Sequence, residues 1–413
     1  MPVNLPAIES LTLHPVKGVR LGWAEAGIKK ANRKDIVVME LAAGSQVAGI
    51  FTLNRFCAAP VTICRQHLAA TSNMRALVIN TGNANAGTGE QGMQDAIRTC
   101  HAVAELLEID AEQVLPFSTG VILEHLPMDK LLAGLPQAVK QLDEANWLAA
   151  AYGIMTTDTA AKAYSTQLKF DSQTVNITGI SKGSGMIHPN MATMLSYLAT
   201  DAELSTELLN EITKEIGDRS FNCISVDGDT STNDSFIIMA TGQSGVRFES
   251  RSDAGFERFY QTLLTAAQVL AQAIVRDGEG ASKFIEVSVH GAKSLAEAKA
   301  VGFAISKSPL VKTAFFASDP NLGRILAAIG YAGRECSSLD DLQTEAIKLY
   351  LGDVLVSENG GRAVSYQEAD GQAVMDQDEI KIRVELNRGQ VQTSVWSCDL
   401  SYEYVRINAD YRT

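Results

Sequence analysis

A threonine that follows an irregular, glycine-rich stretch is the first feature of this sequence that could perform chemistry. Residues 183–195 read Gly-Ser-Gly-Met-Ile-His-Pro-Asn-Met-Ala-Thr-Met-Leu, and an apolar, strand-like run begins directly after Thr193. Glycines and the Pro189-Asn190 pair favour a tightly turned backbone here. If the hydroxyl of Thr193 attacks the carbonyl of Ala192, the peptide bond becomes an ester. Water can hydrolyse that ester, and a new chain then begins at Thr193.

Such a cleavage would activate the same threonine as a nucleophile. A free α-amino group has a pKa of about 7.7–8.0, so an appreciable fraction is neutral near pH 7 and accepts the proton of the adjacent hydroxyl. An internal threonine has no built-in base of this kind. The pattern alone leaves an alternative open, because a glycine-rich turn before a strand needs no catalytic purpose.

A glycine pattern at residues 87–92 could indicate a dinucleotide site. Gly87-Thr88-Gly89-Glu90-Gln91-Gly92 matches GxGxxG and opens an expected helix. A dinucleotide fingerprint needs its first glycine at the end of the strand, so that the helix N-terminus faces the pyrophosphate. Residues 80–86 intervene between the expected strand and these glycines, which argues against nicotinamide binding.

Two other motifs each lack required residues. The loop that begins at Asp227 has oxygen side chains at alternate positions, but Thr232 and Ile238 stand where a calcium loop needs glycine and glutamate. It therefore reads as a polar loop that caps a helix or lines a cleft. Ser184 lacks the flanking glycines of a hydrolase nucleophile elbow, and His188 is a lone histidine for which a surface or packing role is the simpler interpretation.

Composition excludes several classes of protein. The chain has 413 residues, of which 46% are hydrophobic, and a formal charge of −13. This charge argues against nucleic acid as a partner, and the apolar runs are too short to span a membrane. The amino terminus lacks the pattern of a signal peptide. Cysteines and histidines are dispersed without ligand spacing, so we expect a cytoplasmic protein of two or three domains with no bound metal.

Strands and helices alternate along the chain in the pattern of a mixed α+β protein. Apolar runs predict strands at 36–39, 47–51 and 76–79, and helical spacing predicts long helices over 90–108 and 256–276. In the last third we expect a strand at 284–289, a helix from Asp319-Pro320 to about 330 and another over 338–350. Residues 380–386 and 391–395 read as a terminal hairpin with a turn at 387–389. These patterns predict sheets covered by helices, without fixing strand order.

The sequence resembles the ornithine acetyltransferase family, also called the bifunctional glutamate N-acetyltransferases of arginine biosynthesis, over nearly its whole length. The likeness is carried by several segments in one order: 30–35 (KANRKD), 80–89 (NTGNANAGTG), 118–122 (STGVI), 156–159 (TTDT), 182–195, 221–235, 277–280 (DGEG) and 404–411 (YVRINADY).

The resemblance implies an αββα-like sandwich related to autoprocessing aminopeptidases. It also implies cleavage between Ala192 and Thr193, giving an alpha chain of residues 1–192 and a beta chain of residues 193–413. Both chains would stay in one fold, and an α2β2 heterotetramer is expected.

The activity that the resemblance implies is transfer of an acetyl group from N2-acetylornithine to glutamate in arginine biosynthesis. Thr193 would hold the acetyl group as an ester between two half-reactions of ping-pong type. Bifunctional members also accept acetyl-CoA as a donor, so acetyl-CoA is a possible second substrate here. No cofactor is expected.

The same resemblance assigns residues to the site. The backbone at Thr119 and Gly120 would form the oxyanion hole, and the substrate site would be lined by Thr156, Lys182, Thr193, Glu279, Asn408 and Thr413. We hypothesise that Lys182 binds the α-carboxylate shared by ornithine and glutamate, and that Glu279 pairs with the ammonium groups of ornithine. The sequence departs from the family pattern at Leu322, where many relatives have tryptophan, and in its Arg412-Thr413 ending.

Two other functions remain open from the sequence. One is an aminopeptidase of the related fold, in which the free Thr193 would hydrolyse an N-terminal peptide bond. The other is an uncut, non-catalytic protein that binds metabolites. Comparing acetyl transfer with amide hydrolysis tests the first, and the mass of the denatured chain tests the second.

Overall fold

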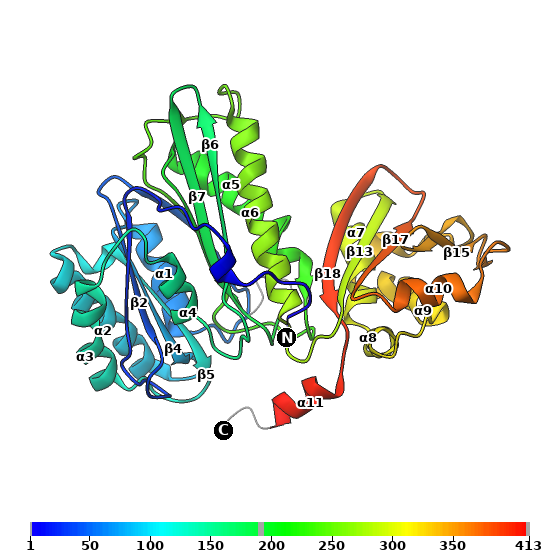
Figure 1. Ribbon diagram of the computed structural model, residues 1–413, viewed down its shortest axis with the longest axis horizontal. Coiled ribbons are helices and arrows are strands. Elements are labelled where there is room, and N and C mark those ends of the chain that lie inside the picture. The colour runs from blue at the N-terminus through cyan, green and yellow to red at the C-terminus, as the bar shows by residue number, and fades with distance from the viewer. Residues whose placement is uncertain (1, 189–193, 410–413) are drawn as a thin grey trace.

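Two β-sheets packed face to face form the centre of the molecule (Figure 1). The computed structural model describes residues 2–188 and 194–409. The first sheet has the order β1 (Val19–Ala24), β2 (Ile36–Leu41), β4 (Ala76–Asn83), β5 (Val114–Val121). The second has the order β3 (Gln46–Phe51), β11 (Ser235–Ala240), β8 (Leu195–Thr200), β7 (Gln173–Lys182), β6 (Lys162–Phe170). A short pair joins β9 (Glu203–Leu204) to β12 (Arg247–Phe248).

Apolar side chains on both faces of the strands explain why each sheet is covered twice. In β4, Leu77 and Ile79 belong to the core between the sheets, whereas Ala76 and Val78 belong to the core under the helices of the first sheet. Successive residues of a strand point to opposite faces, so a continuous apolar run requires cover on both sides.

Helices cover the outer faces and complete four layers in the order α, β, β, α. The first sheet is covered by α2 (Gly89–Leu107) and α3 (Met128–Lys140), and the second by α5 (Thr206–Asp218) and α6 (Phe256–Arg276). The remaining helices of this part are α1 (Ala59–Ala70) and α4 (Trp147–Gly153). The expected αββα-like sandwich is therefore confirmed, as are the two long helices that apolar spacing predicted.

A third sheet forms a separate lobe beside the sandwich (Figure 1). Its order is β10 (Ile224–Ser225), β18 (Val391–Cys398), β13 (Phe284–Ala292), β17 (Glu379–Glu385), β14 (Lys348–Leu351), β15 (Val354–Glu358), β16 (Gly361–Arg362). The helices that follow β13 are α7 (Leu295–Lys307), α8 (Pro309–Phe316), α9 (Leu322–Tyr331), α10 (Glu368–Met375) and α11 (Tyr402–Ala409). Short 3-10 turns lie at Ile8–Ser10, Ala111–Gln113, Phe221–Cys223 and Ala332–Arg334.

The helix predicted over 338–350 is wrong. This segment forms 3-10 turns at Ser337–Leu339 and Thr344–Ala346 and then strand β14, which pairs with β15 and β17. Leu349 and Leu351 are buried by alternation along β14, and this pairing outweighs the local helical spacing. The neighbouring helix α9 begins at Leu322 rather than at Pro320, because the side chain of Asn321 caps it by accepting a hydrogen bond from the Arg324 backbone N–H.

The predicted terminal hairpin is also wrong in its pairing. Both strands exist as β17 and β18, but β13 lies between them, parallel to β17 and antiparallel to β18. The buried face of β13 carries Ile285, Val287 and Val289 at alternate positions. A strand with a fully buried apolar face gains more burial between two partners than at an edge, which favours the central position of β13.

Candidate active site

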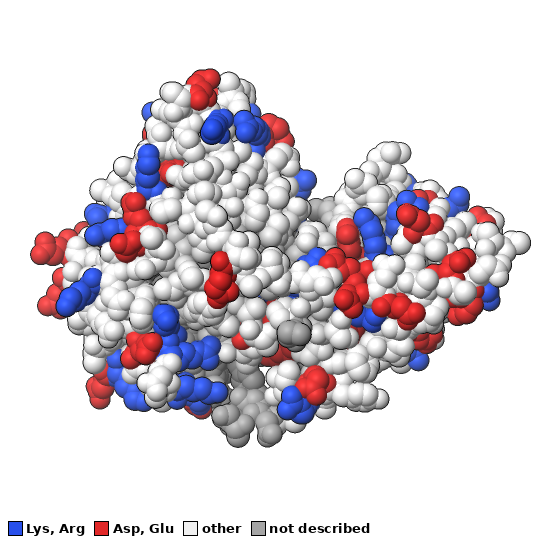
Figure 2. Space-filling model, viewed as in Figure 1, with Lys and Arg blue, Asp and Glu red and all other residues white. Residues whose placement is uncertain are grey.

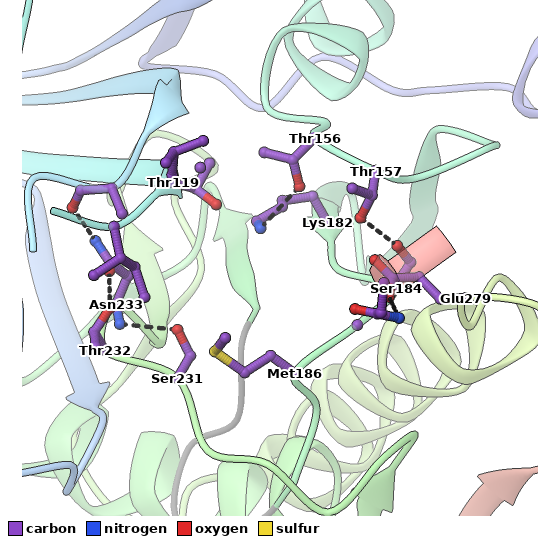
Figure 3. A pocket seen from close by; sticks show the side chains of 16 residues that line it. Thr119, Thr156, Thr157, Lys182, Ser184, Met186, Ser231, Thr232, Asn233 and Glu279 are labelled. Atoms are coloured by element: carbon purple, nitrogen blue, oxygen red, sulfur yellow. Dashed lines mark hydrogen bonds between the residues drawn. The ribbon is translucent and has the colours of Figure 1, made fainter. Parts of the chain in front are cut away.

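A cavity of about 280 Å³ lies where the ends of strands from both sheets meet (Figure 3). It is lined by residues from β5, β7, the loop after α4, the loop before β11, the segment after α6, and α11. Six residues predicted from the resemblance line it: Thr119, Gly120, Thr156, Lys182, Glu279 and Asn408. The other three, Ala192, Thr193 and Thr413, lie outside the described residues.

The backbone at Gly120 has a conformation and a position that only glycine tolerates. Its φ is +138°, and a Cβ atom there would lie 2.3 Å from the backbone carbon of Gly82 and 2.4 Å from the nitrogen of Asn83. The pairing register of β4 and β5 shifts at these two residues. Bulges of this kind interrupt the ladder of hydrogen bonds at a strand end, which is where backbone groups become available to a ligand.

Buried asparagines hold this strand end in place. Asn233 donates from Nδ2 to the carbonyls of Ala84 (2.7 Å), which directly follows β4, and of Ser118 (2.8 Å) in β5. These hydrogen bonds connect the loop before β11 to two neighbouring strands of the first sheet. Asn80 accepts from the Ser118 hydroxyl at 2.6 Å and donates to the Asn83 carbonyl at 2.9 Å. The two sheets are therefore locked together next to Gly120.

Lys182 presents a buried ammonium group to the cavity (Figure 3). Lys182 is 2% exposed, and its Nζ atom donates a long hydrogen bond of 3.4 Å to the Thr156 hydroxyl. Within the described residues no carboxylate lies in ion-pair range of this nitrogen. Burial lowers the pKa of Lys182, and the nearby charges of Asp158, Asp234 and Glu279 act in the opposite direction. A buried cation without a direct partner is costly, so the site favours an incoming anion.

A buried group of three charges lies behind Lys182 and connects the segments that carry the site. Lys162 Nζ donates to Asp158 and Asp277 at 2.6 Å each, and all three side chains are fully buried. Asp158 also accepts from the backbone N–H of Thr156 (2.9 Å) and of Gly183 (2.7 Å). Burial alone would raise the pKa of Asp158, but Lys162, Lys182 and the Gly183 N–H together hold it below its ordinary value.

Glu279 places a carboxylate on the wall of the cavity that is formed after α6. Its Oε2 atom accepts from Asn408 Nδ2 at 2.9 Å, and this contact brings α11 to the site. Gly185 is required beneath this side chain, because a Cβ atom there would lie 2.3 Å from Oε2. Among the described residues that line the cavity, Lys182 supplies a buried cation and Glu279 a carboxylate, so the cavity presents charges of both signs.

Met194 is buried in the core directly before strand β8. Its backbone N–H donates to Asp234 Oδ1 at 3.0 Å, and the next residue, Leu195, pairs with Lys182 of β7 and Ser235 of β11. Asp234 is fully buried, and burial raises its pKa well above the ordinary value. Strand β8 therefore starts beside Lys182.

Several residues that line the cavity were not among the predicted site residues. Thr157 and Ser184 share a hydrogen bond of 2.8 Å on one wall, and Ser231, Thr232 and Asn233 form another (Figure 3). The sequence did carry a signal for the second group, because the polar loop after Asp227 was expected either to cap a helix or to line a cleft. It lines the cavity. Ser184 was set aside as a nucleophile, and as a polar lining residue it had no distinct signal.

The other motifs have structural explanations. Gly92 allows close packing, since a Cβ atom there would lie 1.8 Å from the Thr88 hydroxyl and 2.5 Å from Asn85 Oδ1. The glycine pattern thus shapes the start of α2. His188 lies outside the cavity against Phe303, with ring centroids 5.3 Å apart, and burial lowers its pKa to about 4.

Among residues 2–188 and 194–409, none of the helices combines the length and the apolar character that a membrane-spanning helix needs.

Comparison with known proteins identifies the family. The profile of the ArgJ family matches residues 20–413. The chain is 62% identical to the "Arginine biosynthesis bifunctional protein ArgJ" of Colwellia psychrerythraea, over 100% of both chains. The chain therefore belongs to the ArgJ family. This confirms the resemblance seen in the sequence, and it gives the protein an acetyltransferase role in arginine biosynthesis.

Two solved structures are similar in sequence over about half of the chain. One is the ArgJ protein of Bacillus halodurans, which is 39% identical and covers 52% of this chain and 97% of its own, with a TM-score of 0.48. The other is the ornithine acetyltransferase of Mycobacterium tuberculosis in complex with ornithine. It is 33% identical and covers 44% of this chain and 94% of its own, with a TM-score of 0.36.

Proposed function

We propose that this protein transfers the acetyl group of N2-acetylornithine to glutamate through an acetyl ester on Thr193, after cutting its own chain before that residue. The observation that carries the proposal is the cavity that combines buried Lys182, Glu279 and the glycine backbone at Gly120 next to the start of β8.

The proposed cleavage precedes catalysis. The Thr193 hydroxyl attacks the Ala192 carbonyl, the C–N bond breaks as the C–O bond forms, and water then hydrolyses the ester. This yields residues 1–192 and 193–413. The pairing of β7 with β8 supports the idea that both pieces stay together, since these strands come from opposite sides of the cut and lie side by side in one sheet.

In the first half-reaction the freed α-amino group of Thr193 accepts the proton of its own hydroxyl, whose oxygen attacks the acetyl carbonyl. The C–N bond of acetylornithine breaks, and the leaving amine takes that proton. In the second half-reaction the amine of glutamate attacks the ester carbonyl, the C–N bond of N-acetylglutamate forms as the ester C–O bond breaks, and a proton of the amine passes to the Thr193 oxygen and restores the hydroxyl. Lys182 would bind the α-carboxylate in both steps, and Glu279 would pair with the ammonium groups of ornithine.

Both half-reactions pass through a tetrahedral oxyanion, and the backbone at Thr119 and Gly120 would stabilise it. One such donor lowers the barrier by about 2.7–4 kcal/mol. The absence of a Cβ atom at Gly120 supports this role, because it permits close approach of the reacting carbonyl.

The proposal extends to a second donor, to assembly and to location. Acetyl-CoA would acetylate Thr193 in place of acetylornithine, so that the same site starts and recycles the pathway. We further propose an α2β2 heterotetramer in the cytoplasm.

Trapping the acetylated enzyme tests the proposed function. The mature protein is incubated with N2-acetylornithine alone and denatured, and the piece that starts at Thr193 is measured by mass spectrometry. We expect a gain of one acetyl group and its loss when glutamate is added. Loss of the acetyl group to water at the same rate without glutamate would instead indicate a hydrolase, and no acetylation would refute the mechanism.

Gly120→Ala is expected to lower kcat by about 10²–10³-fold, because the added Cβ displaces the backbone that would bind the oxyanion. Steady-state kinetics and thermal denaturation measure the effects on turnover and on folding separately. Gly330→Ala is the matched control, since no atom lies within 4 Å of a Cβ atom at that position in α9. Wild-type turnover in a folded Gly120→Ala protein would remove this position from the oxyanion hole.

Lys182→Met is expected to raise the KM for acetylornithine and for glutamate by about 10–100-fold, the usual value of a hydrogen bond to a charged group. N-acetylputrescine, which is N2-acetylornithine without the carboxyl group, provides the control. Wild type should use it poorly, and the substitution should change its kinetics little. An equal loss with both donors would show that Lys182 does not recognise the carboxylate.

A further inference from the structure

A basic groove adjoins the cavity at the end of strand β5. It is lined by Lys29, Lys30 and Arg33 together with Asp35, Thr81 and Gly82, and it shares Gly120, Val121, Thr156 and Thr157 with the active-site cavity. The groove and the cavity are therefore neighbours that share these four residues as a wall. Figure 2 shows basic side chains gathered over the lower end of the first sheet, in a protein whose net charge is −13.

The loop that carries these cations is firmly held. Asp35 accepts hydrogen bonds from the backbone N–H groups of Ala26 (2.7 Å) and Ile28 (2.6 Å), and the loop packs on Gly82, where a Cβ atom would lie 2.7 Å from the Cβ of Lys29. Arg33 donates to the backbone carbonyls of Met155 (2.5 Å) and Thr156 (3.0 Å). The cations thus keep a set position relative to Thr156.

Their charges are poorly neutralised. Lys30 is exposed, and it forms no ion pair with any residue that the structure describes. Arg33 is half-buried and donates to backbone carbonyls, but it too has no carboxylate partner among the described residues. Lys29 pairs with Glu124 at 3.2 Å, but both side chains are more than a third exposed, so this pair is weak and replaceable. Asp35 is buried and turned to backbone donors, and burial raises its pKa. Uncompensated cations at one place of an acidic protein focus a field that attracts anions.

We propose that this groove binds the phosphate groups of the nucleotide-bearing thioester acetyl-CoA while its acetyl group reaches the cavity. The inference rests on the proposed function. A cavity of about 280 Å³ suits an amino-acid donor, but drug-sized ligands occupy ~300–1,000 Å³. The nucleotide must therefore lie outside the cavity, and the basic groove is a neighbouring pocket that shares Gly120 with it.

The chemistry of the step balances without a further reactant. The Thr193 oxygen attacks the thioester carbonyl, the C–O bond forms as the C–S bond breaks, and the hydroxyl proton passes through the α-amino group to the leaving thiolate. The groove changes only the binding of the donor. Acetylornithine, which has no phosphate, does not need it.

Donor selectivity tests the proposal. Lys30→Glu is compared with wild type, with Lys30→Arg and with Lys214→Glu, which makes the same charge change on the exposed face of α5. Each protein receives acetyl-CoA, S-acetylpantetheine, which lacks the phosphates of the nucleotide, or N2-acetylornithine, with glutamate as acceptor. We expect Lys30→Glu to raise the KM for acetyl-CoA by about tenfold or more and to leave the other two donors unchanged. Lys30→Arg and Lys214→Glu should behave like wild type.

Binding of CoA, measured by titration calorimetry, gives a readout that is independent of turnover. Wild type should bind CoA with an affinity that falls as ionic strength rises, and Lys30→Glu should bind it more weakly. Equal use of acetyl-CoA and S-acetylpantetheine by wild type would overturn the inference, as would CoA binding that Lys30→Glu leaves intact. A higher KM for glutamate with acetylornithine as donor would assign the groove to the acceptor instead and would also overturn it.

The assay with acetylornithine as donor distinguishes failure of the groove inference from failure of the proposed function. If exchange between acetylornithine and glutamate proceeds but CoA does not bind, the groove inference is wrong and the proposed function stands. If neither donor acetylates the protein, the proposed function fails and the inference fails with it.

Discussion

Replacing Thr193 by alanine is expected to leave one uncut polypeptide and to lower acetyl transfer by about 10⁴-fold or more, the scale on which removing a catalytic nucleophile acts. The variant lacks both the hydroxyl that would attack the Ala192 carbonyl and the group that would hold the acetyl ester. Intact mass under denaturing conditions, followed by sequencing of any internal amino terminus, measures cleavage. Wild type should give residues 1–192 and 193–413.

Thr193→Ser is the matched control, because serine keeps the hydroxyl on the same backbone. It should be cut, though more slowly, and should retain measurable transfer. An uncut wild-type chain with full activity would refute the mechanism and favour a protein whose catalytic group lies elsewhere. Wild-type turnover in Thr193→Ala would refute the nucleophile assignment directly.

Lys162→Met is expected to lower the free energy of unfolding by about 3–5 kcal/mol, because it leaves the carboxylates of Asp158 and Asp277 buried without their cation. Chemical denaturation followed by circular dichroism measures the change. Lys283→Met is the control, since Lys283 is also buried but donates to the carbonyls of Met375 (2.7 Å) and Gln377 (2.9 Å). This substitution should lower the free energy of unfolding by less, because it leaves no buried carboxylate without its cation.

The difference in the free energy of unfolding between wild type and Lys162→Met should become smaller as the pH falls. The pKa of Asp158 is lowered in the folded wild type, so its stabilisation is present above the ordinary value of 3.8 and is lost as the pH falls below it. In the variant, burial without the cation raises the carboxyl pKa, and protonation relieves the penalty. The two unfolding free energies should converge toward acid pH. A gap that stays constant from neutral to acid pH would show that the loss comes from packing.

Local patterns predicted the long helices well. The span of α6 follows from its apolar spacing, and α2 begins one residue before the expected start. Both helices bury one face on a sheet, so the period of apolar residues carries the information. The segment around β14 misled the same reasoning, because its short apolar run fits either period and only its partners β15 and β17 select the strand.

Some residues of the candidate site could be predicted from the sequence, and others could not. Thr119, Gly120, Thr156, Lys182, Glu279 and Asn408 were named from motifs matched to a family, and the fold brings all six to one cavity. Composition and spacing could not have assembled them, since they lie on five separate segments of the chain. The Asp158–Lys162–Asp277 group was not anticipated, because isolated charged residues look like solvated surface until the sheets bury them.

The amino-acid sequence by itself determined the family, the positions of the main helices and strands, and the residues with chemical potential, because these depend on residue types and on periods within a single segment. Tertiary structure alone decided that β13 separates β17 from β18, that β2 and β3 join different sheets across a short turn, and that Lys29 and Lys30 line a groove together with the end of β5. The physical reason is that these outcomes depend on which apolar faces bury each other, and that is a property of pairs of segments far apart in the chain.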